Sequence, residues 1–190
     1  ESVGCQISEI LLKEDEAFCL QKRFVNEIPM DMDMVCLCNP NNPTGQLIDR
    51  EVLEQVADYC QKTDTCLLLD ECFHDFLEEG SVHTLLPQVK ENPKLFVLRA
   101  FTKMYGMAGL RLGYGICSDT ELIRRMEQVT QPWNVSVPAQ AAGIAAAREQ
   151  EFVAVSRQMI TEQKKLLLAG LEAAGAKVYG SAANYIFFRA

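Results

Sequence analysis

The segment Met34-Val-Cys-Leu-Cys-Asn-Pro-Asn-Asn-Pro-Thr-Gly45 joins a short apolar run to a dense cluster of turn-forming residues. An unbroken apolar run is typical of a strand that is buried on both faces. The Asn, Pro and Gly residues predict a sharp turn directly after it. Asp49 is then placed to cap a helix that runs to about Lys62, because apolar residues recur there at helical spacing. We therefore expect a strand, a turn and a helix in this order.

The same alternation continues along the rest of the chain. Apolar runs predict further strands at residues 66–69, 95–98 and 112–117. Helical spacing predicts helices at residues 119–129, 138–148 and 151–174, the last of them ending at Gly175, and strand-like patterning returns at 176–189. Strands that alternate with helices and are apolar throughout predict an α/β fold, with a mostly parallel sheet flanked by helices.

Size and charge narrow the class of protein. The chain has 190 residues, 48% of them hydrophobic and 23% charged, which suits one well-filled domain with the start of a second. A net charge of -8 disfavours nucleic acid as a partner. No apolar run approaches the roughly 18 residues of a membrane span, and no basic-then-apolar leader is present. We expect a cytoplasmic protein with no membrane partner.

The eight cysteines are scattered along the chain and do not predict a disulfide framework. Cys36 and Cys38 alternate within one apolar run and would share a face of a strand. A metal site would need more ligands nearby, and the two histidines, His74 and His83, are not placed to supply them. We expect reduced, buried thiols and no bound metal.

Three predicted strand ends carry polar residues, and in an open parallel sheet ligands bind at the carboxyl ends of the strands. These ends are residues 39–45, Asp70-Glu71 and residues 99–111. Each has a simple explanation alone: a turn, a helix cap, or two solvated charges at Lys103 and Arg111. Their coincidence at successive strand ends favours a ligand site.

The residues at these ends form a recognisable set. The string Arg99-Ala-Phe-Thr-Lys103-Met-Tyr-Gly-Met-Ala-Gly109-Leu-Arg111-Leu-Gly113-Tyr114 resembles the lysine signature of the class I/II aminotransferases, which are fold-type I pyridoxal-phosphate enzymes. Residues 39–45 resemble the family's Asn-Pro-Thr-Gly loop, and Asp70-Glu-Cys-Phe73 resembles its Asp-Glu-Ala-Tyr/Phe. The three motifs occur in the family's order, at compatible spacings, across almost the whole chain.

The resemblance implies two catalytic residues. Lys103 would bind pyridoxal 5'-phosphate as a Schiff base, and burial or a neighbouring cation would lower its pKa so that it can act as nucleophile and base. Asp70 would pair with the pyridine nitrogen and keep it protonated, which makes the ring an electron sink.

The resemblance also implies the residues that bind the cofactor. Asn42 would hydrogen-bond the ring's 3-oxygen, while Arg111 and the Thr102 hydroxyl would bind the phosphate. Two positions depart from the family pattern. Ala100 replaces a Ser or Thr three residues before the lysine, so one phosphate hydroxyl is missing. Phe73 stands where many members have a Tyr that also hydrogen-bonds the 3-oxygen, which leaves Asn42 alone in that task.

Two subfamilies share this pattern. The threonine-phosphate decarboxylases resemble the chain at Phe73, at Pro132-Trp133 and at Ala183-Asn184-Tyr185, and this favours a decarboxylase. The histidinol-phosphate aminotransferases share the lysine segment and remain the alternative. Trp133 and Asn134 are expected to pack rather than to take part in catalysis.

The resemblance further implies that the chain is a fragment. Residues 1–175 would form the core of the large, cofactor-binding domain, truncated at its N-terminus, and residues 176–190 would begin the smaller C-terminal domain. Intact members of the family usually act as homodimers on small amino-acid or amine-phosphate substrates. A non-catalytic fragment that keeps the cofactor-binding signature is a second hypothesis. A nucleotide-binding domain is disfavoured because no Gly-x-Gly-x-x-Gly follows a first strand.

Overall fold

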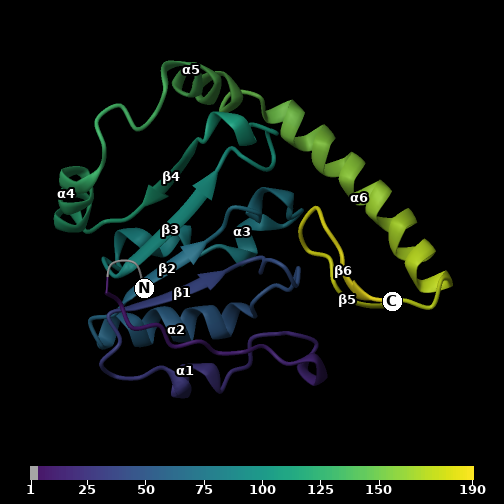
Figure 1. Cartoon of the computed structure of the whole chain (residues 1–190), viewed down its shortest axis with the longest axis horizontal. Coiled ribbons are helices and arrows are strands. Elements are labelled where there is room, and N and C mark those ends of the chain that lie inside the picture. Colours follow the sequence, from purple (N-terminus) through teal and green to yellow (C-terminus); the bar gives the residue numbers. More distant parts are fainter. Residues whose placement is uncertain (1–3) are drawn as a thin grey trace.

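The computed structural model describes residues 4–190, apart from the side chain of Ser81. Its main sheet has the strand order β1-β2-β3-β4 (Figure 1). The strands are β1 (Met34–Cys38), β2 (Cys66–Asp70), β3 (Leu95–Ala100) and β4 (Gly113–Ile116). The first three are parallel to one another, and β4 is antiparallel to β3. The predicted α/β fold with a mostly parallel sheet is confirmed.

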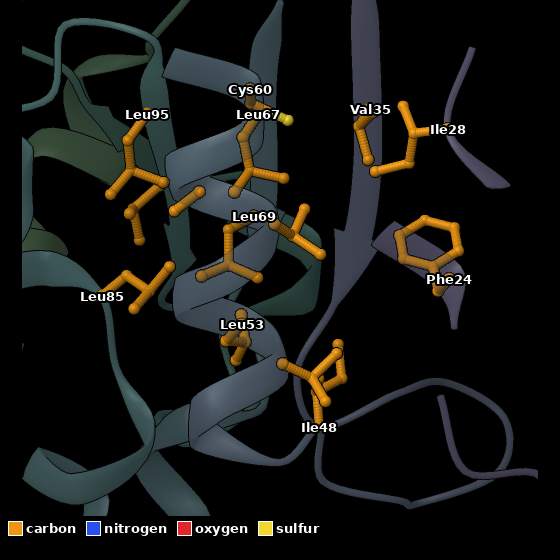
Figure 2. Packing of buried hydrophobic residues seen from close by; sticks show 14 of the residues in the cluster. Phe24, Ile28, Val35, Ile48, Leu53, Cys60, Leu67, Leu69, Leu85 and Leu95 are labelled. Carbon is orange, nitrogen blue, oxygen red and sulfur yellow. The ribbon is translucent and has the colours of Figure 1, made fainter. Parts of the chain in front are cut away.

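Helix α2 (Arg50–Lys62) crosses from β1 to β2 and forms the centre of the core. Its start is fixed by Asp49, whose carboxylate accepts a hydrogen bond of 2.9 Å from the Glu51 N–H, as predicted. Leu53 of α2 is fully buried, as are Leu67 and Leu69 of β2. Figure 2 shows these side chains gathered around the helix. Burial of this apolar stripe provides the main stabilisation of the sheet.

Only one face of the sheet is fully covered in the described chain. Helix α1 (Phe24–Glu27), α2 and the 3₁₀ segment Leu86–Lys90 all contribute to the same core cluster. Burial therefore alternates along β1, where Val35 is buried and its neighbours Met34 and Cys36 are exposed. Burial of both faces was expected; it is found in the first half of β3, where Leu95, Phe96 and Val97 are all buried, and not in β1.

The cysteine prediction is correct in one part and wrong in the other. All eight cysteines are free thiols, but only Cys60 is buried. The expectation of burial failed because it assumed covered strands, and Cys36 lies on the open face of β1.

Three further helices complete the C-terminal half: α4 (Thr120–Val129), α5 (Val137–Ala146) and α6 (Gln150–Ala173). All three were predicted to within two residues. Helix α6 runs along the outside of the molecule (Figure 1) and has no buried residue. Trp133, in the segment between α4 and α5, is 95% exposed, so the expectation that it packs is wrong for this chain.

Two antiparallel strands, β5 (Lys177–Gly180) and β6 (Phe187–Arg189), form a second small sheet. The loop between them returns toward the carboxyl end of β1 (Figure 1), and we refer to residues 177–189 as the C-terminal hairpin. The domain boundary at residue 175 stays a prediction.

The remaining elements are short. They are the 3₁₀ segments Glu14–Glu16, His74–Phe76 and Ala108–Leu110, and helix α3 (Gly80–His83). None of the helices within residues 4–190 is both long and apolar enough to cross a membrane.

Candidate active site

The loop at residues 39–46 holds its shape through its own hydrogen bonds. The Asn41 carbonyl accepts from the Gly45 N–H at 2.7 Å, and the Asn41 amide donates to the Thr44 hydroxyl at 2.7 Å. Asn39 is fully buried at the base, where its Oδ1 accepts from the Ile48 N–H at 2.9 Å. Asn42, the predicted ligand of the 3-oxygen, lies exposed at the tip. The loop is therefore a fixed platform for the Asn42 side chain.

The C-terminal hairpin packs backbone to backbone against this loop. The Ala182 N–H donates to the Gly45 carbonyl at 2.9 Å. A Cβ atom added at Gly180 would lie 2.3 Å from the Thr44 carbonyl oxygen, and one at Gly45 would lie 3.1 Å from the Gly180 carbonyl carbon. Gly45 also has φ +67°, a conformation that favours glycine. Both glycines are required for the close approach.

Asp70 ends β2 beside this loop. Its carboxylate accepts a hydrogen bond of 2.8 Å from the Cys72 N–H, and its carbonyl accepts from the Asn39 N–H at 2.9 Å. Burial, and then a hydrogen bond to Asp70, raises the pKa of Cys72 to about 12. Burial, and then the Asp70 charge, raises the pKa of Cys38 to about 11. The two thiols stay protonated at neutral pH, so they add no negative charge beside Asp70.

Lys103 lies in the turn that follows β3, close to Phe73. Its Nζ is 5.0 Å from the centroid of the Phe73 ring, within the range of a cation–π contact. Phe73 is 8% exposed and packs edge-on against Tyr185, with ring centroids 5.1 Å apart. Lys103 itself is exposed, so the buried setting expected for its amine is not found in this chain. The turn carries it beyond the end of the sheet.

The predicted phosphate-binding residues are not brought into contact with the others. Thr102 is half-buried in the same turn as Lys103. Arg111 is exposed, with φ +53°, and its Nη1 donates to the Ala108 carbonyl at 3.2 Å. In the part of the chain that is described, no hydrogen bond or ion pair joins Arg111 to Lys103 or Asp70. The residues that the structure does gather at one edge of the sheet are the Asn42 loop, Asp70, Phe73 and Lys103.

A buried ion pair at the same strand ends was not predicted from the sequence. Glu71 is 1% exposed and accepts from Arg99 Nη2 at 2.6 Å and from Arg99 Nε at 2.9 Å. The Thr84 hydroxyl donates to the same carboxylate at 2.8 Å. Opposite charges at the ends of two neighbouring apolar runs, residues 66–69 and 95–98, were a signal for this pair. Glu71 is therefore a structural carboxylate, whereas Asp70, its neighbour in the chain, faces the candidate site.

Tyr185 was also missed as a site residue, although its motif was noted. Its hydroxyl donates to the Asn41 carbonyl at 2.6 Å. Burial, and then the neighbouring acidic groups of Cys38 and Asp70, raises the pKa of Tyr185 to about 12. No local sequence pattern joins positions 41 and 185, so only the fold could bring them together.

A sheet whose carboxyl edge presents a carboxylate, an amide and a lysine amine is typical of pyridoxal-phosphate enzymes of fold type I. The model of the family Aminotransferase class I and II matches residues 13–190, and the chain belongs to this family. Pyridoxal phosphate is the family's cofactor. The residues present fit that group, because Asp70 offers an anion beside two neutral thiols and Lys103 offers an accessible amine.

Two similar proteins bear the names of the two expected subfamilies. The chain is 34% identical over 187 residues to the threonine-phosphate decarboxylase of Salmonella typhimurium, covering 98% of this chain and 51% of that protein. It is also 34% identical over 187 residues to the histidinol-phosphate aminotransferase of Oleidesulfovibrio alaskensis, covering 97% and 48%.

The structural comparison agrees with the family assignment. The solved histidinol-phosphate aminotransferase of Clostridium acetobutylicum superposes with a TM-score of 0.86 and 29% identity, over 92% of this chain and 53% of that one. The chain spans about half the length of the curated relatives it matches.

Proposed function

We propose that the protein is a pyridoxal-phosphate enzyme that binds its cofactor through Lys103 and decarboxylates an amino-acid phosphate of the threonine-phosphate type. The observation that carries this proposal is the contact of the Lys103 amine with the Phe73 ring, at the edge of the sheet where Asp70 and the Asn42 loop also lie. The bound cofactor would supply an electron sink for the carbanion left when CO2 departs.

The predicted site residues have the following tasks in this proposal. The Asp70 carboxylate would accept a hydrogen bond from the protonated pyridine nitrogen and so stabilise its positive charge. The Asn42 amide would donate to the 3-oxygen. Thr102 and Arg111 would bind the phosphate, which requires the Arg111 side chain to leave the Ala108 carbonyl. The Lys103 amine would hold the cofactor covalently and could carry a proton at the reacting carbon of the substrate.

The identity of the substrate rests on Phe73. A Phe at this position resembles the threonine-phosphate decarboxylases, and the Salmonella protein of that name is a relative at 34% identity. The alternative, a histidinol-phosphate type aminotransferase, is supported by an equal identity to the Oleidesulfovibrio protein and by the superposition on the Clostridium structure. We also propose a homodimer in the cytoplasm, which the free thiols and the family resemblance support.

The covalent link is tested by reduction. Borohydride treatment of the full-length protein with pyridoxal phosphate should fix the label on Lys103, as shown by peptide mass mapping, and Lys103→Ala should abolish it. Lys164 is the informative competitor, because burial lowers the pKa of its amine and makes it more nucleophilic. A label on Lys164 in place of Lys103 would contradict the proposal.

The reaction is tested by its products. Full-length protein given threonine phosphate, with no 2-oxo acid, should release CO2 over many turnovers. Histidinol phosphate with 2-oxoglutarate should yield no glutamate. The reverse pair of results would establish the aminotransferase instead. No reaction with either substrate and no label on Lys103 would contradict both enzyme proposals.

A further inference from the structure

Tyr185 contacts two parts of the candidate site at once. Its hydroxyl donates to the carbonyl of Asn41, directly before Asn42, at 2.6 Å. Its ring packs edge-on against Phe73, with an interplanar angle of 87°, and the Lys103 amine lies over that same Phe73 ring. One side chain of the C-terminal hairpin therefore touches both the amide-bearing loop and the ring beside the lysine.

The hydrogen bond to Asn41 completes the turn of the loop. The Asn41 carbonyl already accepts from the Gly45 N–H at 2.7 Å, and a carbonyl oxygen has two lone pairs. The Tyr185 hydroxyl uses the second. Because the pKa of Tyr185 is raised to about 12, the phenol keeps its proton and remains a donor throughout the neutral range.

The need for such an anchor follows from Phe73. A phenylalanine cannot donate to the cofactor's 3-oxygen, so the Asn42 amide is the remaining donor among the predicted ligands. Since that amide is at the exposed tip of the loop, its direction depends on how firmly the Asn41 backbone is held. A side chain that fixes Asn41 therefore sets the strength of the one hydrogen bond that the 3-oxygen receives.

We propose that Tyr185 is a positioning residue for the cofactor, its hydroxyl holding the backbone beside Asn42 and its ring holding Phe73 under Lys103. This inference rests on the proposed function, because it assigns Asn42 and Lys103 to the cofactor. Tyr185 acts through these residues rather than on the reacting atoms.

Two variants of Tyr185 and one matched control separate the effect of its hydroxyl from the effect of its ring. Tyr185→Phe removes the hydroxyl and keeps the ring against Phe73. Tyr185→Leu removes both. Tyr179→Phe is the control, because it removes a hydroxyl from the same hairpin. The Tyr179 hydroxyl contacts Glu14 and not the loop at residues 39–46.

The first measurement needs no cofactor. Hydrogen–deuterium exchange of the cofactor-free protein should show the amides of residues 41–46 exchanging about two- to tenfold faster in Tyr185→Phe than in wild type, the effect of one lost hydrogen bond. The Tyr179→Phe control should exchange as wild type does. Unchanged exchange in Tyr185→Phe would overturn the proposal, whatever the protein binds.

The second measurement follows the visible absorption band of the lysine-bound cofactor as a function of pH. A donor to the 3-oxygen favours the deprotonated imine, so a misplaced Asn42 raises the midpoint. Tyr185→Phe should raise it by about 0.5 to 1 pH unit, and Tyr185→Leu by more. A wild-type band with an unmoved midpoint in Tyr185→Phe would overturn the positioning role and leave the proposed function intact. Absence of the band in wild type would count against the proposed function, and the exchange measurement would then decide the role of Tyr185 alone.

Discussion

Asp70 and Glu71 are neighbours at the end of one strand, yet they belong to regions with opposite properties. Glu71 faces the inner region, where Arg99 and Thr84 saturate a carboxylate that is 1% exposed. Asp70 faces the open region with Lys103 and the Asn42 loop, and the hydrogen bond to its carboxylate from the backbone is the one from Cys72. A charge whose partners are all internal can only support the fold, whereas a charge with spare acceptor capacity can serve a ligand.

The division makes the two regions separable by substitution. Changes in the inner region should lower the free energy of unfolding. Changes in the open region should alter the binding or the pH midpoint of the cofactor and leave the free energy of unfolding nearly unchanged.

The largest effect is expected for Glu71→Ala. It leaves the Arg99 guanidinium buried without its main partner, which should lower the free energy of unfolding by about 3–5 kcal/mol. Urea unfolding with an unchanged m-value would measure this. Replacing both residues, Glu71→Leu with Arg99→Leu, should recover most of the loss. A loss below about 1 kcal/mol for Glu71→Ala alone would show that the pair is not a structural unit.

Next in size is Phe73→Tyr, in the open region. It adds a phenol that can donate to the 3-oxygen, and a hydrogen bond to a charged acceptor contributes about 1.5–3 kcal/mol. The pH midpoint of the cofactor's visible band should therefore fall by roughly one to two units. A midpoint that stays at the wild-type value would mean that Phe73 does not face the cofactor.

A smaller effect is expected for Thr84→Val, which removes one donor from the buried Glu71 carboxylate and should lower the free energy of unfolding by about 1–2 kcal/mol. Thr161→Val is a suitable control, because the Thr161 hydroxyl bonds Glu78 at an exposed site and its loss should change stability by less than about 0.5 kcal/mol. Equal losses for both variants would remove the distinction between buried and exposed contacts.

The smallest change in stability is expected for Asp70→Asn. The amide keeps an oxygen that can accept from the Cys72 N–H, so the free energy of unfolding should stay within about 0.5 kcal/mol of wild type. The loss of negative charge should nevertheless raise the dissociation constant of pyridoxal phosphate at least about tenfold, measured by fluorescence titration. A destabilisation as large as that of Glu71→Ala would show that Asp70 is structural too.

Strand and helix positions could be read from the sequence because local apolar patterns encode them. The run Met34–Cys38 is β1, and Asp49 caps α2 as predicted. The pattern could not predict how many faces of a strand are covered. An apolar run is compatible with a strand that has one open face as well as with a strand that is covered on both faces. The exposure of Cys36 is the result.

The candidate site was predictable in its residues and less so in their arrangement. Asp70, Phe73, Lys103 and Asn42 lie at the strand ends where the motifs put them. The roles of Arg99 and Tyr185 depend on contacts between distant segments, which no local pattern records. Whether the six predicted site residues bind the cofactor stays a prediction.

The Tyr185–Asn41 hydrogen bond also has a consequence for the order of folding during protein synthesis. Its two residues are 144 positions apart in the chain. At about 5–20 residues per second, a ribosome needs roughly 7 to 30 seconds to extend the chain from one to the other. During that interval the Asn42 loop can already have emerged while its anchor has not been made. Cofactor capture that depends on the anchored loop would therefore be a late event, well after the β1–α2–β2 unit has had time to fold.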